Sequence, residues 1–207
     1  MNRTLTAIFG FVVVEQVLLG WAPQADRLTW ALENGPVWIG VVAVALTHRR
    51  FPLSHLCLVL LAVHSLILAV GGHYTYAKVP LGDWVRDAFA LSRNHYDRLG
   101  HFAQGFVPAI LAREVLVRRL NLRGWTAGAL AVACCLAFSA FYELIEWWTA
   151  LLSEEAASAF LGTQGDVWDT QWDMFLALVG AITALLLLSG WHDRSMAKLQ
   201  RPTPDPP

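Results

Sequence analysis

Residues 52–72 read PLSHLCLVLLAVHSLILAVGG, and this stretch decides the class of fold. It contains no Asp, Glu, Lys or Arg, and a helix needs about 20 predominantly apolar residues to cross a bilayer. We therefore expect a transmembrane helix here. Five further stretches of similar character predict an all-α, polytopic membrane protein with a bundle of six transmembrane helices; they are, roughly, residues 5–22, 30–47, 100–117, 125–152 and 172–190.

The composition agrees with a membrane protein. Hydrophobic residues make up 56% of the 207 residues and charged residues only 15%, whereas a soluble domain carries about 25% charge. The mean hydropathy is +0.46. The formal net charge is −1 and no basic face emerges, so we expect the lipid bilayer, and no nucleic acid, as a partner.

The ends of the chain need separate interpretation. The first stretch, 5–22, resembles a signal peptide, but Glu15 falls in its apolar part and no good small-residue cleavage site follows. We therefore predict a retained helix and a single domain over residues 1–193. Residues 194–207 are Pro-rich and predict a short cytoplasmic tail. Cys57, Cys134 and Cys135 lie in apolar stretches and are interpreted as small buried hydrophobes.

Charge asymmetry orients the predicted bundle. With a cytoplasmic N-terminus, ten of the 15 Lys and Arg residues fall on the cytoplasmic side: Arg3, Arg49, Arg50, Arg113, Arg118, Arg119, Arg123, Arg194, Lys198 and Arg201. The loop between the last two helices has neither Lys nor Arg, and it carries Glu154, Glu155, Asp166 and Asp169. Both termini are therefore predicted to be cytoplasmic.

The stretch 93–102, RNHYDRLGHF, concentrates ionisable groups at the start of an apolar helix. Such groups are costly to place in a membrane protein and commonly mark a functional site. The predicted topology brings two later acidic clusters to the same, outer side. Each cluster has helical spacing that presents its members on one face, which we expect to point into the bundle: Asp97 with His101, Glu143 with Glu146, and Asp169 with Asp173.

Clustered carboxylates repel one another unless a cation lies between them or they are protonated. Carboxylates with imidazole suit a divalent cation such as Zn, Mg or Mn, which could activate water or polarise an ester or phosphoryl oxygen. The sequence therefore suggests a metal-dependent hydrolase or transferase that acts on a lipid or lipid-linked substrate. The predicted metal ligands are Asp97, His101, Glu146, Asp169 and Asp173.

The remaining polar residues of this side receive supporting roles. Glu143 or His95 is the candidate general base, and Arg93 and Arg98 are expected to bind an anionic head group. His73 and Tyr76 are also assigned to substrate binding.

Simpler interpretations remain open for each cluster. Asp97 at a helix start is also explained by the positive end of the helix dipole. Glu143 and Glu146 could be satisfied by interhelical hydrogen bonds or by arginines of the long loop, and His64 by packing inside the bundle. Two other functions stay in competition: a transporter or ion-handling protein that uses the carboxylates as a coupling site, and a non-catalytic envelope module that binds a lipid-linked ligand.

Four motifs carry a resemblance to a known family: residues 71–76 (GGHYTY), 93–102, 142–147 (YELIEW) and 164–174 (QGDVWDTQWDM). In these the chain resembles the YjdF family of bacterial inner-membrane proteins, which implies a multi-pass protein of the inner (plasma) membrane but no known activity. A shorter stretch, residues 97–102 (DRLGHF), is similar to the Asp-Lys-x-x-His-Phe helix start of VanZ-like proteins, with Arg98 in place of Lys. That similarity implies a cell-envelope setting.

Overall fold

The structure, a computed structural model, describes residues 3–152 and 164–199. All regular elements in these ranges are helical, as predicted. Six long helices form the body: α1 (Arg3–Gly20), α2 (Arg27–Thr47), α3 (His55–Tyr74), α5 (Tyr96–Arg119), α6 (Gly124–Leu152) and α8 (Asp169–Ala197). Two short ones, η1 (Tyr76–Lys78) and α4 (Pro80–Ala88), interrupt what the sequence suggested was one long loop.

Length and hydropathy qualify four of these helices as membrane spans: α2, α3, α6 and α8. The apolar part of α1, Thr4–Gly20, is shorter than a full span. Helix α5 is long enough, but ionisable side chains at both of its ends make it less apolar. The prediction of an all-helical membrane protein is thus confirmed, and most helix ends lie within four residues of those expected. Helix α8 is the exception, because it ends at Ala197, seven residues beyond the expected end and inside the predicted tail.

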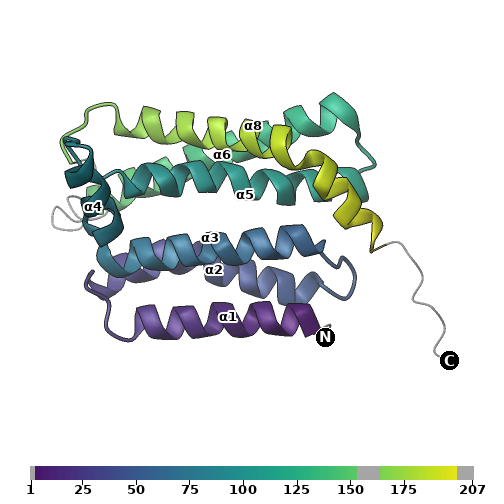
Figure 1. Cartoon of the computed structure of the whole chain (residues 1–207), viewed down its shortest axis with the longest axis horizontal. Coiled ribbons are helices and arrows are strands. Elements are labelled where there is room, and N and C mark those ends of the chain that lie inside the picture. Colours follow the sequence, from purple (N-terminus) through teal and green to yellow (C-terminus); the bar gives the residue numbers. More distant parts are fainter. Residues whose placement is uncertain (1–2, 153–163, 200–207) are drawn as a thin grey trace.

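The helices run side by side in two groups of three (Figure 1). Helices α1 and α2 each pack on α3, whereas α6 and α8 each pack on α5. The two groups meet mainly where α3 packs against α5. The short helix α4 lies across one end of the bundle (Figure 1), and the acidic motifs lie at that same end. We call it the acidic end, and the opposite end the Arg-rich end.

Helices α5 and α8 approach each other at glycines, and their contact is the most extensive in the bundle. A Cβ atom added to Gly105 would lie 1.8 Å from the carbonyl oxygen of Ala177, and one added to Gly180 would lie 2.1 Å from that of Phe102. Small residues of this kind allow helix backbones in a membrane to pack closely. This contact fixes the axial position of Asp173 on α8 relative to His101 on α5.

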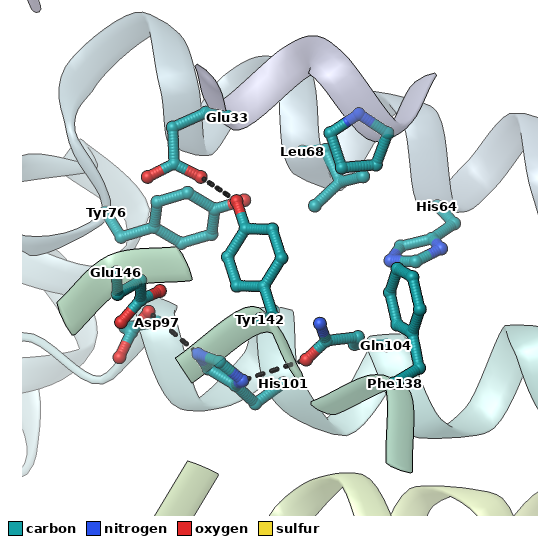
Figure 2. Close-up of a pocket in the computed structure, with 12 residues that line it drawn as sticks. Glu33, His64, Leu68, Tyr76, Asp97, His101, Gln104, Phe138, Tyr142 and Glu146 are labelled. Atoms are coloured by element: carbon teal, nitrogen blue, oxygen red, sulfur yellow. Dashed lines mark hydrogen bonds and ion pairs between the residues drawn. The ribbon is translucent and has the colours of Figure 1, made fainter. Parts of the chain in front are cut away.

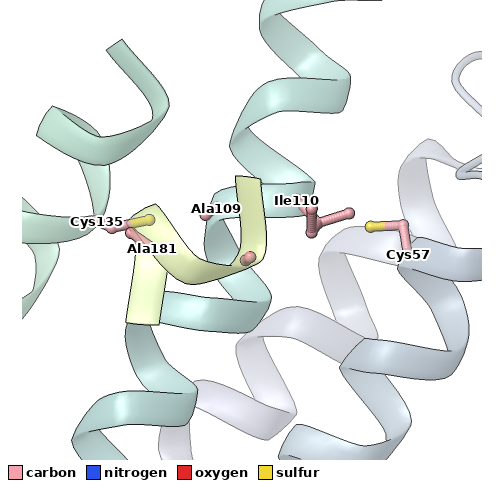
Figure 3. Packing of buried hydrophobic residues seen from close by; sticks show 6 residues of the cluster. Cys57, Ala109, Ile110, Cys135 and Ala181 are labelled. Atoms are coloured by element: carbon pink, nitrogen blue, oxygen red, sulfur yellow. The ribbon is translucent and has the colours of Figure 1, made fainter. Parts of the chain in front are cut away.

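The apolar core lies between α3, α5, α6 and α8 and consists mainly of small side chains (Figure 3). Its fully buried members are Cys57, Ala109, Ile110, Cys135, Ala181 and Ala184. Cys57 and Cys135 are therefore buried hydrophobes, as expected. The same prediction was wrong for Cys134, which is exposed, because adjacent residues of a helix point about 100° apart and only one of the pair can face α8.

A buried polar network lies at the Arg-rich end of the bundle, between α3, α5 and α8. The carboxylate of Glu114, on α5, accepts from the backbone N–H and the hydroxyl of Ser54 at 2.7 and 2.6 Å. It also pairs with Arg118 at 2.5 Å and with His192 of α8 at 3.0 Å. Glu114 and His192 have no exposed surface. This network, which we call the Glu114 network, ties α3, α5 and α8 together.

Candidate metal centre

The candidate site is centred on His101, in the second turn of α5. Its Nδ1 atom lies 2.9 Å from the amide oxygen of Gln104. An amide oxygen can only accept, so Nδ1 donates, and in the neutral ring the lone pair is on Nε2. Nε2 faces Asp97 Oδ1 at 3.6 Å and Asp173 Oδ2 at 3.9 Å. The ring is thus held with Nε2 toward two carboxylates.

These distances suit a shared cation better than hydrogen bonds. They exceed the 2.7–3.2 Å of a normal N–H···O bond. Zinc ligands lie about 2.0–2.2 Å from the metal, so two ligands of a tetrahedral zinc ion are roughly 3.4 Å apart. One ligand atom each of Asp97, His101 and Asp173 fall within 4.8 Å of one another. A small inward movement of these side chains would complete a three-ligand set.

Two glutamates of α6 also lie close to this imidazole. His101, Glu143 and Glu146 form a second group whose ligand atoms lie within 4.8 Å of one another. Glu143 Oε1 is 3.9 Å from His101 Nδ1. Among the residues that the structure describes, Glu143 Oε1 and Asp173 Oδ1 are buried without a hydrogen-bond partner. An unpaired buried carboxylate is costly, so both oxygens call for a proton or a cation.

A small pocket of about 40 Å³ opens beside His101, enough for one ion with a water or two. Figure 2 shows His101 between Asp97 and Gln104, with Tyr142 donating to Glu33 at 3.2 Å across the pocket. Glu33 comes from α2 and Tyr142 from α6, so this bond joins the two groups of helices. The other polar residues that line the pocket are His64, Tyr76 and Glu146.

The two arginines of the 93–102 motif bind carboxylates of the α8 entry. Arg93 pairs with Asp169 at 2.6 Å, and Arg98 pairs with Asp166 at 2.6 Å. The Arg98 guanidinium also lies over the Trp172 ring, 5.3 Å from its centroid. In the described part of the chain, the ion-pair partner of Asp97, Glu143 and Asp173 is His101. The inner carboxylates are therefore not neutralised by these two arginines.

Asn94 fixes the segment that carries these arginines. Its amide nitrogen donates to the carbonyl of Val79 at 3.0 Å, and its amide oxygen accepts from the N–H of Tyr96 at 3.0 Å. Its backbone exchanges two hydrogen bonds with the side-chain amide of Gln164, at 3.0 and 2.8 Å. The start of α5, the α4 region and the α8 entry are thereby held as one unit around the site.

Comparison with known proteins agrees with this description. A family model described as "Predicted membrane protein (DUF2238)" matches residues 4–194. The chain belongs to the DUF2238 family. Inner membrane protein YjdF of Escherichia coli (strain K12) is 53% identical to this DUF2238 protein over 174 residues, which cover 84% of the present chain and 83% of the relative. No solved structure matches.

The resemblance to the YjdF family, inferred from four motifs, is therefore confirmed, as is the predicted membrane localisation. The relative is named as an inner-membrane protein, in agreement with the inner-membrane setting expected for this DUF2238 protein. Neither the family description nor the name of the relative states an activity.

The structure separates the predicted site residues of this DUF2238 protein into two shells. The inner group is His101 and the four carboxylates around its imidazole, which are Asp97, Glu143, Glu146 and Asp173. The others lie outside that inner group: Arg93, Arg98 and Asp169 in the ion pairs, Tyr76 on the pocket wall, His95 before α5, and His73 beside the loop that joins α1 to α2.

His95 and His73 have distinct surroundings. Burial, with the positive charges of Arg98 and Arg93, lowers the pKa of His95, which therefore stays neutral near pH 7. That state suits the general base that we predicted. His73 Nδ1 lies 2.7 Å from the carbonyl oxygen of Leu19, and the His73 carbonyl accepts from Gln24 and Ala25. His73 thus holds the turn between α1 and α2.

Two residues of the inner site were not assigned a role from the sequence. Gln104 lies one helical turn beyond His101, so its position on the same face of α5 was readable from the spacing. Tyr142 directly precedes Glu143 in a motif already noted. Its bond to Glu33 depends on how α2 and α6 are placed in space, and no local pattern encodes that placement.

Proposed function

We propose that this protein is a metal-dependent hydrolase or transferase of the inner membrane that acts on the polar part of a lipid or lipid-linked substrate. The observation that carries the proposal is the placement of His101, whose free Nε2 faces Asp97 and Asp173 while Nδ1 is bound by Gln104. A ligating histidine usually has its second ring nitrogen hydrogen-bonded in this way.

The proposal includes a topology. All six long helices cross the membrane as a single domain over residues 1–193, both termini are cytoplasmic, and the acidic end faces outward. The distribution of Lys and Arg supports this orientation, as does the common end of the bundle at which α1 begins and α8 ends (Figure 1). The site then lies in the outer half of the membrane, where lipid head groups are within reach.

Each inner residue takes a role. Asp97, His101 and Asp173 hold a divalent cation of the Zn, Mg or Mn type, with Glu146 as a further ligand. The ion activates water or polarises an ester or phosphoryl oxygen. Glu143 accepts the proton of the attacking water or hydroxyl, and neutral His95 is the alternative base. Arg93 and Arg98, paired with Asp169 and Asp166, are the candidate contacts for an anionic head group.

Elemental analysis of the detergent-purified protein tests the proposal. We expect about one equivalent of a divalent metal in the wild type and its loss in His101→Ala, Asp97→Ala and Asp173→Ala. The control is Asp87→Ala, which removes a carboxylate that is 69% exposed on α4. A metal-free wild type, or full metal content in His101→Ala, would rule out the proposed centre. Metal-dependent release of a water-soluble product from lipid vesicles then tests the reaction.

A coupled transporter is the second candidate, because Glu143 and Asp173 each have a buried oxygen that could carry a proton. Transport needs access from both sides, and in this conformation the buried core and the Glu114 network fill the space between α3, α5 and α8 toward the Arg-rich end. Substrate-driven proton uptake in proteoliposomes would favour the transporter. Ligand binding with neither metal nor turnover would favour a non-catalytic envelope module.

A further inference from the structure

A large apolar groove is lined by residues of α1, α2, α3, α5 and α6. Its volume is about 850 Å³, near the top of the usual range of about 300–1,000 Å³ for small-molecule sites. Its walls are mainly Leu, Val, Ala and Phe side chains. An apolar space of this size between membrane helices is suited to hydrocarbon.

The groove has the length of one leaflet of a bilayer. Its lining runs from Pro36 to Thr47 along α2 and from Pro108 to Arg119 along α5. Eleven helical steps of 1.5 Å give roughly 16 Å, about half of a hydrocarbon core that is about 30 Å thick. The groove therefore extends from mid-bundle to the Arg-rich end.

Two arginines line the groove where it reaches the Arg-rich end, Arg50 and Arg119. Among the residues that the structure describes, no acidic side chain forms an ion pair with either of them. Their neighbours differ in this respect, since Arg113 pairs with Asp193 and Arg118 with Glu114. The open end of the groove thus offers two guanidinium groups to an anion.

We propose that this groove binds an anionic glycerophospholipid of the cytoplasmic leaflet. Its acyl chain lies in the groove, and its phosphate lies between Arg50 and Arg119. Basic pockets between helices on the cytoplasmic side are known to hold anionic head groups, and guanidinium groups bind phosphate with two parallel hydrogen bonds. The proposal does not depend on the metal centre, which occupies the other end of the bundle.

The inner end of the groove touches the acidic pocket. Pro36, His64, Leu68 and Phe138 line both spaces. The end of a bound acyl chain would therefore cover the inner wall of the acidic pocket and exclude water from that side. This contact links the occupancy of the groove to the solvation of the carboxylates.

Native mass spectrometry of the full-length protein in mild detergent tests the proposal with two probes of identical chains, dioleoyl phosphatidylglycerol and dioleoyl phosphatidylcholine. We expect the wild type to prefer phosphatidylglycerol. The double variant Arg50→Gln, Arg119→Gln should bind it roughly 30-fold more weakly, which corresponds to about 1 kcal/mol for each arginine. The matched control is Arg49→Gln, Arg123→Gln, which removes two arginines of the same end that do not line the groove.

A second pair of variants tests the chain site. Gly40 lines the groove, and a Cβ atom added there meets nothing within 4 Å, so we expect Gly40→Phe to place its ring in the groove. Gly190→Phe is the control, because Gly190 is equally open but lies away from the groove. Gly40→Phe should weaken the binding of both lipids, whereas Gly190→Phe should leave the binding of both unchanged. Equal binding of the two lipids by the wild type, or undiminished binding by Gly40→Phe, would overturn the proposal.

Discussion

The Arg93 guanidinium donates to Asp169 Oδ1 at 2.6 Å, and the two side chains, 76 positions apart, are only 7% and 6% exposed. This ion pair joins the segment before α5 to the first turn of α8. It also separates the outer carboxylates, which have arginine partners, from the inner ones around His101. The same pair therefore contributes both to the fold and to the charge of the candidate site.

Arg93→Ala should destabilise the protein strongly. Removal of one partner of a buried ion pair leaves an uncompensated charge and typically costs about 3–5 kcal/mol. Thermal unfolding in mild detergent measures the effect, and Asp169→Asn in the Arg93→Ala background should recover part of it. Arg86→Ala is the control, because the Arg86 pairs are exposed and ion pairs of this kind contribute little to stability. Equal unfolding temperatures for Arg93→Ala and Arg86→Ala would show that the buried pair is not stabilising.

Gln104→Leu should weaken metal binding without the loss of any ligand. Loss of the hydrogen bond to His101 Nδ1 frees the ring to turn, and such outer contacts are typically worth 10- to 100-fold in metal affinity. Gln104→Glu keeps an acceptor at that position and should retain most of the affinity. Equilibrium dialysis against buffered metal measures both variants. If Gln104→Leu binds metal like the wild type, His101 does not act as a ligand through Nε2.

Gly180→Ala should destabilise the contact between α5 and α8. Its new Cβ would lie 2.1 Å from a backbone oxygen of Phe102, which cannot move aside as a side chain can. Overpacking of this kind typically costs about 1–3 kcal/mol. Gly128→Ala is the matched control, because its nearest neighbour is the Leu185 Cδ1 atom at 3.8 Å. In thermal unfolding, Gly180→Ala should have a lower melting temperature than Gly128→Ala. The reverse order would contradict the packing described.

The protein should lose stability on acidification, in part through His95. Its pKa is lower in the folded protein than in the unfolded chain, so the unfolded chain binds more protons as the pH falls below about 6.5. Protonation therefore favours unfolding over that range, and the loss is complete below the folded pKa. His95→Gln, which cannot be protonated there, should show a shallower decline between pH 7.5 and pH 5. An unchanged pH profile of the unfolding temperature would contradict this role.

Much of the fold was readable from the sequence because lipid imposes a simple rule. An α-helical chain that crosses a membrane must form its backbone hydrogen bonds within each helix. The lengths of the apolar stretches were therefore enough to locate six long helices. The same rule explains why polar residues at helical spacing were expected to face inward, and His101 with Asp97 lies inside the bundle.

The arrangement of the site was less accessible. Arg93 and Arg98 were assigned to a head group, yet each binds a carboxylate more than 60 positions away. Charge pairing between distant segments depends on how the helices pack against one another. The spacing of residues within one helix does not predict that packing. Gln104 was overlooked for another reason. It is uncharged, and its role becomes evident only from its contact with the His101 ring.

The Glu114 network has a consequence for the biogenesis of the chain. Its carboxylate needs Ser54, which precedes α3, and His192, near the end of α8. During synthesis α5 therefore enters the membrane with a carboxylate whose partners are incomplete until the last helix arrives. A polypeptide halted before α8 lacks His192, so its Glu114 carboxylate keeps the Ser54 and Arg118 contacts alone until the final helix is added.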